Sequence, residues 1–283
     1  MFDLFGNEII QDELLRDKFI EPPFSILDTK SGNWQKRKKL WINKGIRSEV
    51  GRDSKVINMG TTNVEKNSAE YVSVFDPALC EVLYHWFCES GGNILDPFAG
   101  GSVRGIVANY LGYKYTGIDI RQEQIESNRD QAFKILPIEN QPNWFVGDSN
   151  ELLDNKWMIE FDLVMSCPPY ADLEKYSDLD GDISNKEYPV FLQLYESIIK
   201  KSCNNLKKGG YACFVVGEVR DKNGYYLGFV PDTIKAFYKC GMKFYNEAIL
   251  LNAIASASMR ANGNMKSKKL VKVHQNILVF KKP

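Results

Sequence analysis

The chain has 283 residues, of which 44% are hydrophobic and 25% are charged, and its 36 basic and 36 acidic residues balance to a formal charge of zero. This composition excludes global disorder, and the length suits one large α/β domain with an appendage rather than two full domains. Because the net charge is zero, a nucleic-acid-binding protein of this kind must gather its basic residues locally.

The chain begins with MFDLFGNEIIQDELL, which is acidic and lacks the basic and apolar regions of a secretory signal. No apolar stretch approaches the roughly 18 residues of a membrane-spanning helix. The six cysteines form no C-x-x-C pair, which favours free thiols over disulfides or a zinc site. We therefore expect a cytoplasmic protein that has no membrane segment and no metal site.

The first 70 residues differ from the rest and form a basic N-terminal segment. Trp34 and Trp41 are interleaved there with basic residues, which outnumber the two acids of residues 30–55. A single basic run is usually a solvated face, but basic residues interleaved with aromatic ones also suit phosphate contacts, so this segment is a candidate nucleic-acid-contacting appendage. The basic residues are Lys30, Lys36, Arg37, Lys38, Lys39, Lys44, Arg47, Arg52 and Lys55.

From residue 71 onward, strand-like runs alternate with helical patterns, which predicts a catalytic domain over residues 71–283. Such alternation is typical of βαβ units in a Rossmann-like α/β fold with a mostly parallel sheet. No convincing helix separates the last two strands, so we expect them to form a terminal antiparallel pair in a seven-stranded sheet. Strands are predicted at 93–96, 114–119, 143–147, 162–166, 211–217, 243–251 and 276–281, and helices at 78–89, 102–111, 121–136, 188–206 and 231–240.

The first strand of this domain runs into the motif NILDPFAGGS. Asp96 ends the strand and can accept a hydrogen bond from a cationic ammonium, while Gly100 and Gly101 let a ligand approach the backbone closely. A tight glycine turn with Ser102 as a helix cap is an equally simple interpretation. The loop has no G-K-[ST] ending, so it does not predict a nucleoside triphosphate site.

Two further strands also end in acids, Asp119 after Gly117-Ile118 and Asp148 after Gly147. Asp119, about 20 residues beyond the first loop, can accept hydrogen bonds from ribose hydroxyls. Asp148 can accept a hydrogen bond from the amine of an adenine ring. S-adenosylmethionine carries an ammonium, a ribose and an adenine. NAD fits less well, because its pyrophosphate would lie beside the acid of the first loop.

The fourth strand ends in Ser166-Cys167-Pro168-Pro169-Tyr170. The two prolines stiffen the turn and have no N–H to compete for their carbonyls. The Pro168 carbonyl can therefore accept a hydrogen bond from a target amine, and the Tyr170 ring can stack on a base that is flipped out of a duplex.

DPFAGG followed by CPPY resembles the amino-methylating DNA methyltransferases, which act on adenine N6 or cytosine N4. SVFDPALCEVLYHWF resembles the family segment that closes over the cofactor. The chain is also similar, through EPPFSILDTKSGNWQKRKKLW and VHQNILVF, to methylases of bacteriophages and mobile elements, a group associated with restriction-modification.

This resemblance implies the Rossmann-like S-adenosylmethionine-dependent methyltransferase fold, S-adenosylmethionine as the cofactor and double-stranded DNA as the partner, with adenine N6 favoured over cytosine N4. It implies that Cys167, Pro168, Pro169 and Tyr170 are the catalytic residues. The implied cofactor-binding residues are Phe75, Asp96, Pro97, Phe98, Gly100, Asp119, Ile120, Asp148 and Ser149.

Cys167 departs from the family pattern, which has Asp, Asn or Ser before Pro-Pro-Tyr. A thiol is a poor acceptor, so the site would depend on the Pro168 carbonyl or recruit Ser166. Alternatively, Cys167 is a nucleophile for methylation at carbon five of a pyrimidine. An RNA methyltransferase, a protein-glutamine methyltransferase and a non-catalytic DNA-binding descendant also remain open.

Two other segments carry local charge. Residues 260–272 contain five basic residues and no acid, in a Gly-, Asn- and Ser-rich stretch, so we expect DNA specificity to come from residues 20–70 and 252–275. Residues 171–187 are acidic but lack the spacing of an EF-hand, which argues against calcium.

Overall fold

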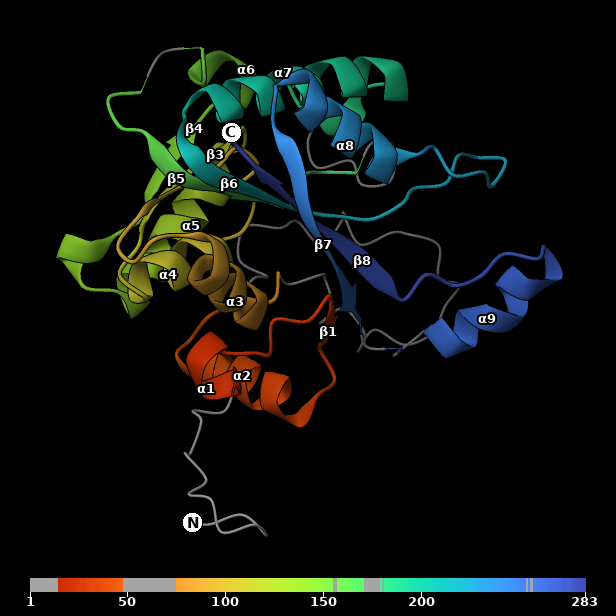
Figure 1. Cartoon of the computed structure of the whole chain (residues 1–283), viewed down its shortest axis with the longest axis horizontal. Coiled ribbons are helices and arrows are strands. Elements are labelled where there is room, and N and C mark those ends of the chain that lie inside the picture. The colour runs from red at the N-terminus through yellow and green to blue at the C-terminus, as the bar shows by residue number, and fades with distance from the viewer. Residues whose placement is uncertain are drawn as a thin grey trace, which may run out of the picture.

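The computed structural model describes residues 15–47, 75–154, 157–170, 179, 181–252, 254 and 257–283 (Figure 1). Within these residues a sheet of eight strands has the order β1-β7-β8-β6-β5-β2-β3-β4. The strands are β1 (Ile26–Asp28), β2 (Asn93–Asp96), β3 (Lys114–Asp119), β4 (Asn143–Val146), β5 (Phe161–Ser166), β6 (Leu206–Val216), β7 (Lys243–Leu251) and β8 (His274–Lys281).

All neighbouring strands are parallel except where β8 lies antiparallel between β6 and β7. The predicted fold class, a mostly parallel sheet that ends in an antiparallel pair, is therefore confirmed. The predicted count of seven strands needs a correction, because β1 adds an eighth strand parallel to β7. With three residues, β1 is too short to produce a recognisable alternation of apolar and polar positions.

Helices cover both faces of the sheet (Figure 1). Consecutive strand residues face opposite ways, so Ile94 and Leu163 join the buried cluster under α3 and α4, and Leu95 and Val164 join the cluster under α7 and α8. The helices are α1 (Leu15–Phe19), α2 (Gly32–Asn43), α3 (Pro77–Phe87), α4 (Val103–Tyr110), α5 (Gln122–Ile135), η2 (Ile138–Asn140), α6 (Ser149–Leu152), η3 (Ile183–Asn185), α7 (Tyr188–Asn204), α8 (Phe229–Lys239) and α9 (Ala257–Lys266). None of the helices in these ranges has the length and apolarity needed to cross a bilayer.

The N-terminal segment packs on the domain through α2 and α3. Trp34 and Trp41 are 1% and 4% exposed, and their indole N–H groups donate to Asp76, the N-cap of α3 (3.1 Å), and to Glu81 on α3 (3.0 Å). These tryptophans belong to the core, although they are interleaved with basic residues in the sequence. The predicted domain boundary at residue 70, and Arg52 and Lys55 with it, lie outside the described residues.

Helix α9 lies between β7 and β8, where we expected an irregular stretch. Only Ala257 of α9 is buried, so its sequence shows no apolar stripe from which a helix could be predicted. The helix projects from the body of the protein on the side toward which β6 points (Figure 1).

Candidate active site

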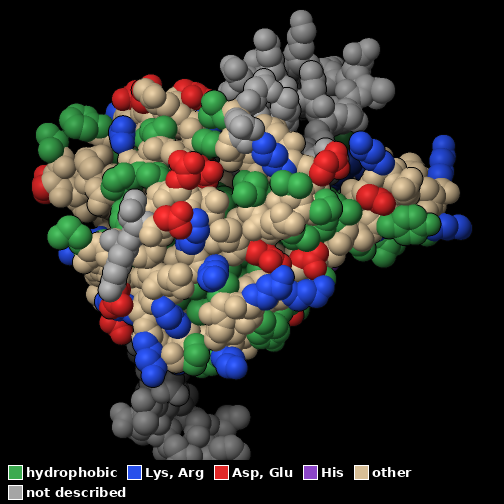
Figure 2. Space-filling view, turned by 90° about the horizontal axis from the view of Figure 1, so that it is seen from above, with side chains coloured by type: hydrophobic (Ala, Val, Ile, Leu, Met, Phe, Trp, Pro, Cys, Tyr) green, Lys and Arg blue, Asp and Glu red, His purple; other side chains and the backbone are tan. Residues whose placement is uncertain are grey.

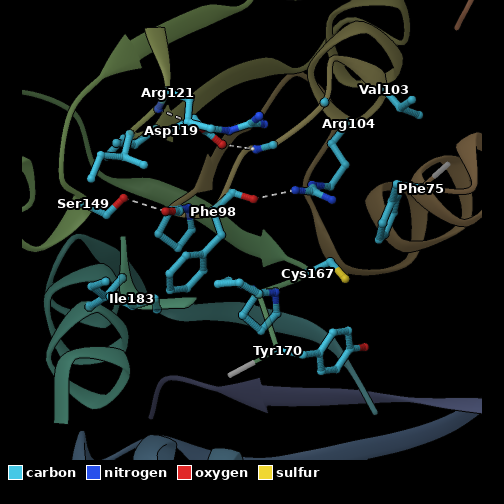
Figure 3. A pocket seen from close by; sticks show the side chains of 18 of the residues that line it. Phe75, Phe98, Val103, Arg104, Asp119, Arg121, Ser149, Cys167, Tyr170 and Ile183 are labelled. Atoms are coloured by element: carbon cyan, nitrogen blue, oxygen red, sulfur yellow. Dashed lines mark hydrogen bonds and ion pairs between the residues drawn. The ribbon is translucent and has the colours of Figure 1, made fainter. Parts of the chain in front are cut away.

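A cavity of about 470 Å³ lies at the carboxyl ends of the central strands (Figure 3). This is the edge at which ligands bind in open α/β sheets. The predicted site residues, other than Asp96, line this cavity: Phe75, Pro97, Phe98, Gly100, Asp119, Ile120, Asp148, Ser149, Cys167, Pro168, Pro169 and Tyr170. Motifs that are far apart in the sequence therefore meet around one space.

The loop between β2 and α4 forms one wall of the cavity. Gly100 has a φ of 49°, and a Cβ atom on it would meet no atom within 4 Å, so its surface faces open space. The Gly100 N–H donates to Asp119 Oδ2 (2.9 Å), and its carbonyl accepts from Asn128 (2.7 Å). Ser102 does not cap α4, because its hydroxyl donates to Gln131 (2.7 Å). The loop is thus held open by β3 and α5.

Two carboxylates lie at the ends of neighbouring strands. Asp119 is the last residue of β3, and Asp148 lies two residues beyond the end of β4. Asp119 Oδ1 accepts from the Arg121 N–H (2.9 Å). Burial raises the pKa of the Asp119 carboxyl, although the charge of Arg121 and the N–H groups of Arg121 and Gly100 offset part of the rise. Asp148 caps α6 by accepting from the Asn150 N–H (2.7 Å). Both carboxylates thus stand at the cavity wall with fixed orientations.

Asp96 lies beneath the cavity rather than at its wall. It is fully buried, and one oxygen accepts from the Ser166 hydroxyl (2.6 Å) and the Phe98 N–H (3.1 Å). The other accepts from the Tyr115 hydroxyl (2.8 Å) and Arg104 Nε (2.5 Å). The sequence analysis expected Asp96 to accept directly from a cofactor ammonium. This expectation does not fit the structure, because Asp96 is buried and does not line the cavity. The alternative that recruits Ser166 to the target amine is wrong, since Ser166 is buried and bonded to Asp96.

Arg104 is a site residue that the sequence analysis missed. It lines the cavity although it is only 5% exposed, and Nη2 donates to the carbonyls of Phe98 (2.6 Å) and Ala99 (2.9 Å). Its guanidinium carbon lies 4.7 Å from the centre of the Phe75 ring. Burial is the largest single influence and lowers the pKa of Arg104, but the charge and hydrogen bond of Asp96, together with Tyr115 and Cys167, raise the pKa overall. An arginine within the apolar run SVRGIVA was the available signal.

Cys167 and Tyr170 lie on the side of the cavity opposite the Asp119 loop, with Cys167 near Arg104 (Figure 3). The Tyr170 hydroxyl accepts from Gln275 of β8 (2.9 Å), and its ring packs edge-on against Phe229 with the ring centres 5.9 Å apart. The contact with Gln275 was not predictable from the sequence. The two residues are 105 positions apart, and they meet because β8 pairs with β6, which lies beside β5.

The N-terminal segment also contributes to the wall, through Thr29, Gln35 and Lys38. Lys38 pairs with Asp76 (3.2 Å), and Arg37 pairs with Glu81 (2.7 Å). Part of the predicted basic run therefore neutralises acids of α3. The acidic segment 171–178 lies outside the described residues, but Gly181, Asp182 and Ile183 beyond it line the cavity.

Residues 14–130 match the profile of the N6/N4 DNA methylase family. Over these residues, which are less than half of the chain, the sequence is similar to that family. The family resemblance expected from the motifs is thereby confirmed, whereas the narrower likeness to bacteriophage and mobile-element enzymes stays a prediction.

Two other kinds of protein are similar to this chain. A release factor glutamine methyltransferase of Fusobacterium nucleatum is 31% identical over 134 residues, which are 44% of this chain and 37% of that protein. The aligned part is thus well under half of the relative. The structure of magnesium protoporphyrin IX methyltransferase from Synechocystis, solved with bound S-adenosylmethionine, has a TM-score of 0.51 at 14% identity, over 86% of this chain and 96% of that one.

A candidate DNA modification methylase of Thermus thermophilus aligns at 22% identity with a TM-score of 0.37, over 49% of this chain and 52% of that one. The fold is that of S-adenosylmethionine-dependent methyltransferases. Family and fold together support a methyltransferase with S-adenosylmethionine, the cofactor predicted from the sequence.

Proposed function

We propose that the protein is a DNA methyltransferase that modifies the exocyclic amine of a flipped base, with adenine N6 favoured over cytosine N4. The observation that carries this proposal is the shared cavity. The residues of the Cys-Pro-Pro-Tyr turn line the same space as Gly100, Asp119 and Asp148, so a cofactor and a target base would meet there.

The cofactor half of the cavity fits S-adenosylmethionine, which supplies an electrophilic methyl group when bound. The open surface over Gly100 leaves room for a ligand. Asp119 would accept from the ribose hydroxyls and Asp148 from the adenine amine, with Phe98 and Ile120 as apolar walls. Because the Asp119 and Asp148 carboxylates are already oriented by backbone N–H groups, binding would require little reorganisation.

The target half would work by orientation. The Pro168 carbonyl would accept from the target amine, and the Tyr170 ring would stack on the base, with its hydroxyl held by Gln275. An amine can lose its proton after it has attacked, so no general base is required. Correct placement and a fixed acceptor then provide the catalysis.

Two projecting elements supply a surface for DNA. Helix α9 exposes Arg260 and Lys266, and Lys268, two residues beyond its end, is also exposed. The hairpin that precedes α8 exposes Tyr225 (74%) and Tyr226 (51%) and projects on the same side as α9 (Figure 1). Lys and Arg side chains gather on the projecting arm at the right of the space-filling view (Figure 2). Basic groups beside exposed aromatic rings suit phosphates and unstacked bases.

The decisive experiment is to incubate the protein with labelled S-adenosylmethionine and mixed-sequence duplex DNA, and then to identify the modified nucleoside by mass spectrometry. N6-methyladenine or N4-methylcytosine is the expected product. 5-Methylcytosine would instead make Cys167 a nucleophile. Bound cofactor without any modified nucleoside would refute DNA as the substrate.

A protein-glutamine methyltransferase is the second candidate, favoured by the relative from Fusobacterium nucleatum. A side-chain amide also presents an NH₂ group to a proline carbonyl, so the Cys-Pro-Pro-Tyr turn serves both substrates. Duplex DNA, RNA and a glutamine-containing release factor should be compared as acceptors in the same assay. Incorporation into the release factor alone would favour this candidate.

A further inference from the structure

We propose that Arg104 binds the α-carboxylate at the methionine end of S-adenosylmethionine, an inference that rests on the cofactor assignment of the proposed function. The sequence analysis instead expected Asp96 to accept a hydrogen bond from the ammonium at the same end of the cofactor. In the structure the guanidinium of Arg104 stands between Asp96 and the cavity, so the ligand would meet a cation at this place rather than an acid.

The position of Arg104 in the cavity fits the methionine end. Arg104 lies beside Phe75 and above Cys167, whereas Asp119 lies at the other side of the loop (Figure 3). If Asp119 holds the ribose, the amino-acid part of the ligand extends from it past Phe98 toward Cys167. This end must also be nearest to the Cys-Pro-Pro-Tyr turn, because the transferred methyl group is attached to the methionine sulfur.

The hydrogen bonds of Arg104 leave one nitrogen for a ligand. Nε donates to Asp96, and Nη2 donates to the carbonyls of Phe98 and Ala99. Within the described part of the chain, Nη1 makes no hydrogen bond. The side chain is only 6% exposed, and its accessible part lies at the cavity wall. A desolvated guanidinium nitrogen with free N–H groups is a strong donor to a carboxylate.

The other basic side chains that line the cavity, Lys38 and Arg121, already form ion pairs with acids. Lys38 pairs with Asp76 at 3.2 Å, and Arg121 lies 3.8 Å from Asp119, at the ribose side. Asp96 balances the charge of Arg104, so a zwitterionic amino-acid group can approach without net repulsion of its ammonium. Three hydrogen bonds hold the guanidinium in place, so little conformational entropy is lost when the ligand binds.

The test compares two ligands that differ only in the carboxylate, S-adenosylmethionine and decarboxylated S-adenosylmethionine, by isothermal titration calorimetry without DNA. The wild-type protein should bind the decarboxylated ligand roughly 10- to 100-fold more weakly, as expected for loss of a hydrogen bond between charged groups. R104Q should bind S-adenosylmethionine more weakly by a similar factor and should no longer distinguish the two ligands.

Two further variants keep the test interpretable. R104Q leaves Asp96 as an unpaired buried charge, which can prevent folding. D96N/R104Q removes both charges and should also fail to distinguish the ligands, with a thermal transition that shows it is folded. R129Q is the matched control, because Arg129 is an exposed arginine of α5 outside the cavity, and it should distinguish the ligands as the wild type does.

Equal affinity of the wild type for both ligands overturns the role of Arg104 and leaves the cofactor assignment standing. Retained discrimination in the folded D96N/R104Q protein does the same. If the wild type binds neither ligand, the cofactor assignment itself fails, and with it this inference. Since no DNA is present, none of these results depends on the substrate.

Discussion

Asp119 joins the loops that follow β2 and β3, because one oxygen binds the Gly100 N–H and the other binds the Arg121 N–H. D119A removes the proposed ribose acceptor and also releases the Gly100 loop. We expect S-adenosylhomocysteine to bind at least roughly 10-fold more weakly, as measured by calorimetry. D130A, which changes an exposed aspartate of α5, should bind normally, and unchanged affinity in D119A would remove this residue from the site.

The pH dependence of cofactor binding offers a second measure of the same residue. Burial raises the pKa of Asp119, so it protonates at a higher pH than an exposed aspartate near 4. The ionised form is the one that accepts two ribose hydroxyls. Affinity should therefore decline on acidification from above that usual value, and D119N should show a flatter profile.

Tyr170 allows stacking to be separated from hydrogen bonding. Y170A removes the ring, and we expect turnover to fall by roughly 10- to 100-fold, the range for removal of a base–aromatic stack, with cofactor affinity unchanged. Y170F keeps the ring and removes the hydroxyl, which accepts a hydrogen bond from Gln275, so it should retain most of the activity. Full activity of Y170A in steady-state methylation assays would exclude the stacking role.

Cys167 distinguishes two chemistries. If the target is an exocyclic amine, C167A should keep activity within about threefold, because the Pro168 carbonyl rather than the thiol orients the amine. Complete loss of methylation in C167A, with S-adenosylhomocysteine binding intact, would point to a covalent step at carbon five.

At the scale of elements, α2 is held on α3 by two buried tryptophans that each donate to an acid. W41A should lower the free energy of unfolding by about 3–5 kcal/mol in denaturant titrations, because it leaves a large cavity and removes a hydrogen bond to Glu81. L40A changes the neighbouring side chain, which is 62% exposed, and should be nearly neutral. A small effect of W41A would mean that α2 contributes little to the core.

Helix α9 projects from the body and carries basic residues, and the proposed DNA surface predicts that they contact phosphates (Figure 1). The K266A/K268A variant should bind DNA more weakly, and the slope of log affinity against log salt should become shallower by up to about 0.9 for each phosphate that is no longer neutralised. K114A is the control, since Lys114 begins β3 and thus lies at the end of the sheet away from the cavity. Wild-type binding and salt slope in K266A/K268A would remove α9 from the DNA surface.

For the molecule as a whole, the buried strands were the most predictable part. The bounds predicted for β2 and β3 match the structure, because strands in a covered parallel sheet are continuous apolar runs with clear ends. The bounds predicted for β7 match as well, although most of its residues are exposed or half-buried. The short strand β1 and helix α9 were missed, since neither buries a periodic apolar face. The sequence of α2 predicts a basic surface, because charge is visible in a sequence and the packing of Trp34 and Trp41 is not.

The candidate site was predictable as a set of loops, because strand order brings the ends of β2, β3, β4 and β5 to one edge. The geometry inside the site was not predictable. Asp96 has the same position relative to its strand as Asp119, yet it lies beneath the cavity because Arg104, Tyr115 and Ser166 converge on it. Such networks depend on which side chains happen to face each other across the core.

The pairing of β1 with β7 has a further consequence for the behaviour of the protein in solution. Strand β7 is long, and its far side would otherwise present a row of unsatisfied backbone N–H and C=O groups, to which a strand of another molecule can add. β1 covers Ile249, Leu250 and Leu251 of that row. The segment that contributes to the wall of the cavity thus also shortens the part of β7 to which another strand can add.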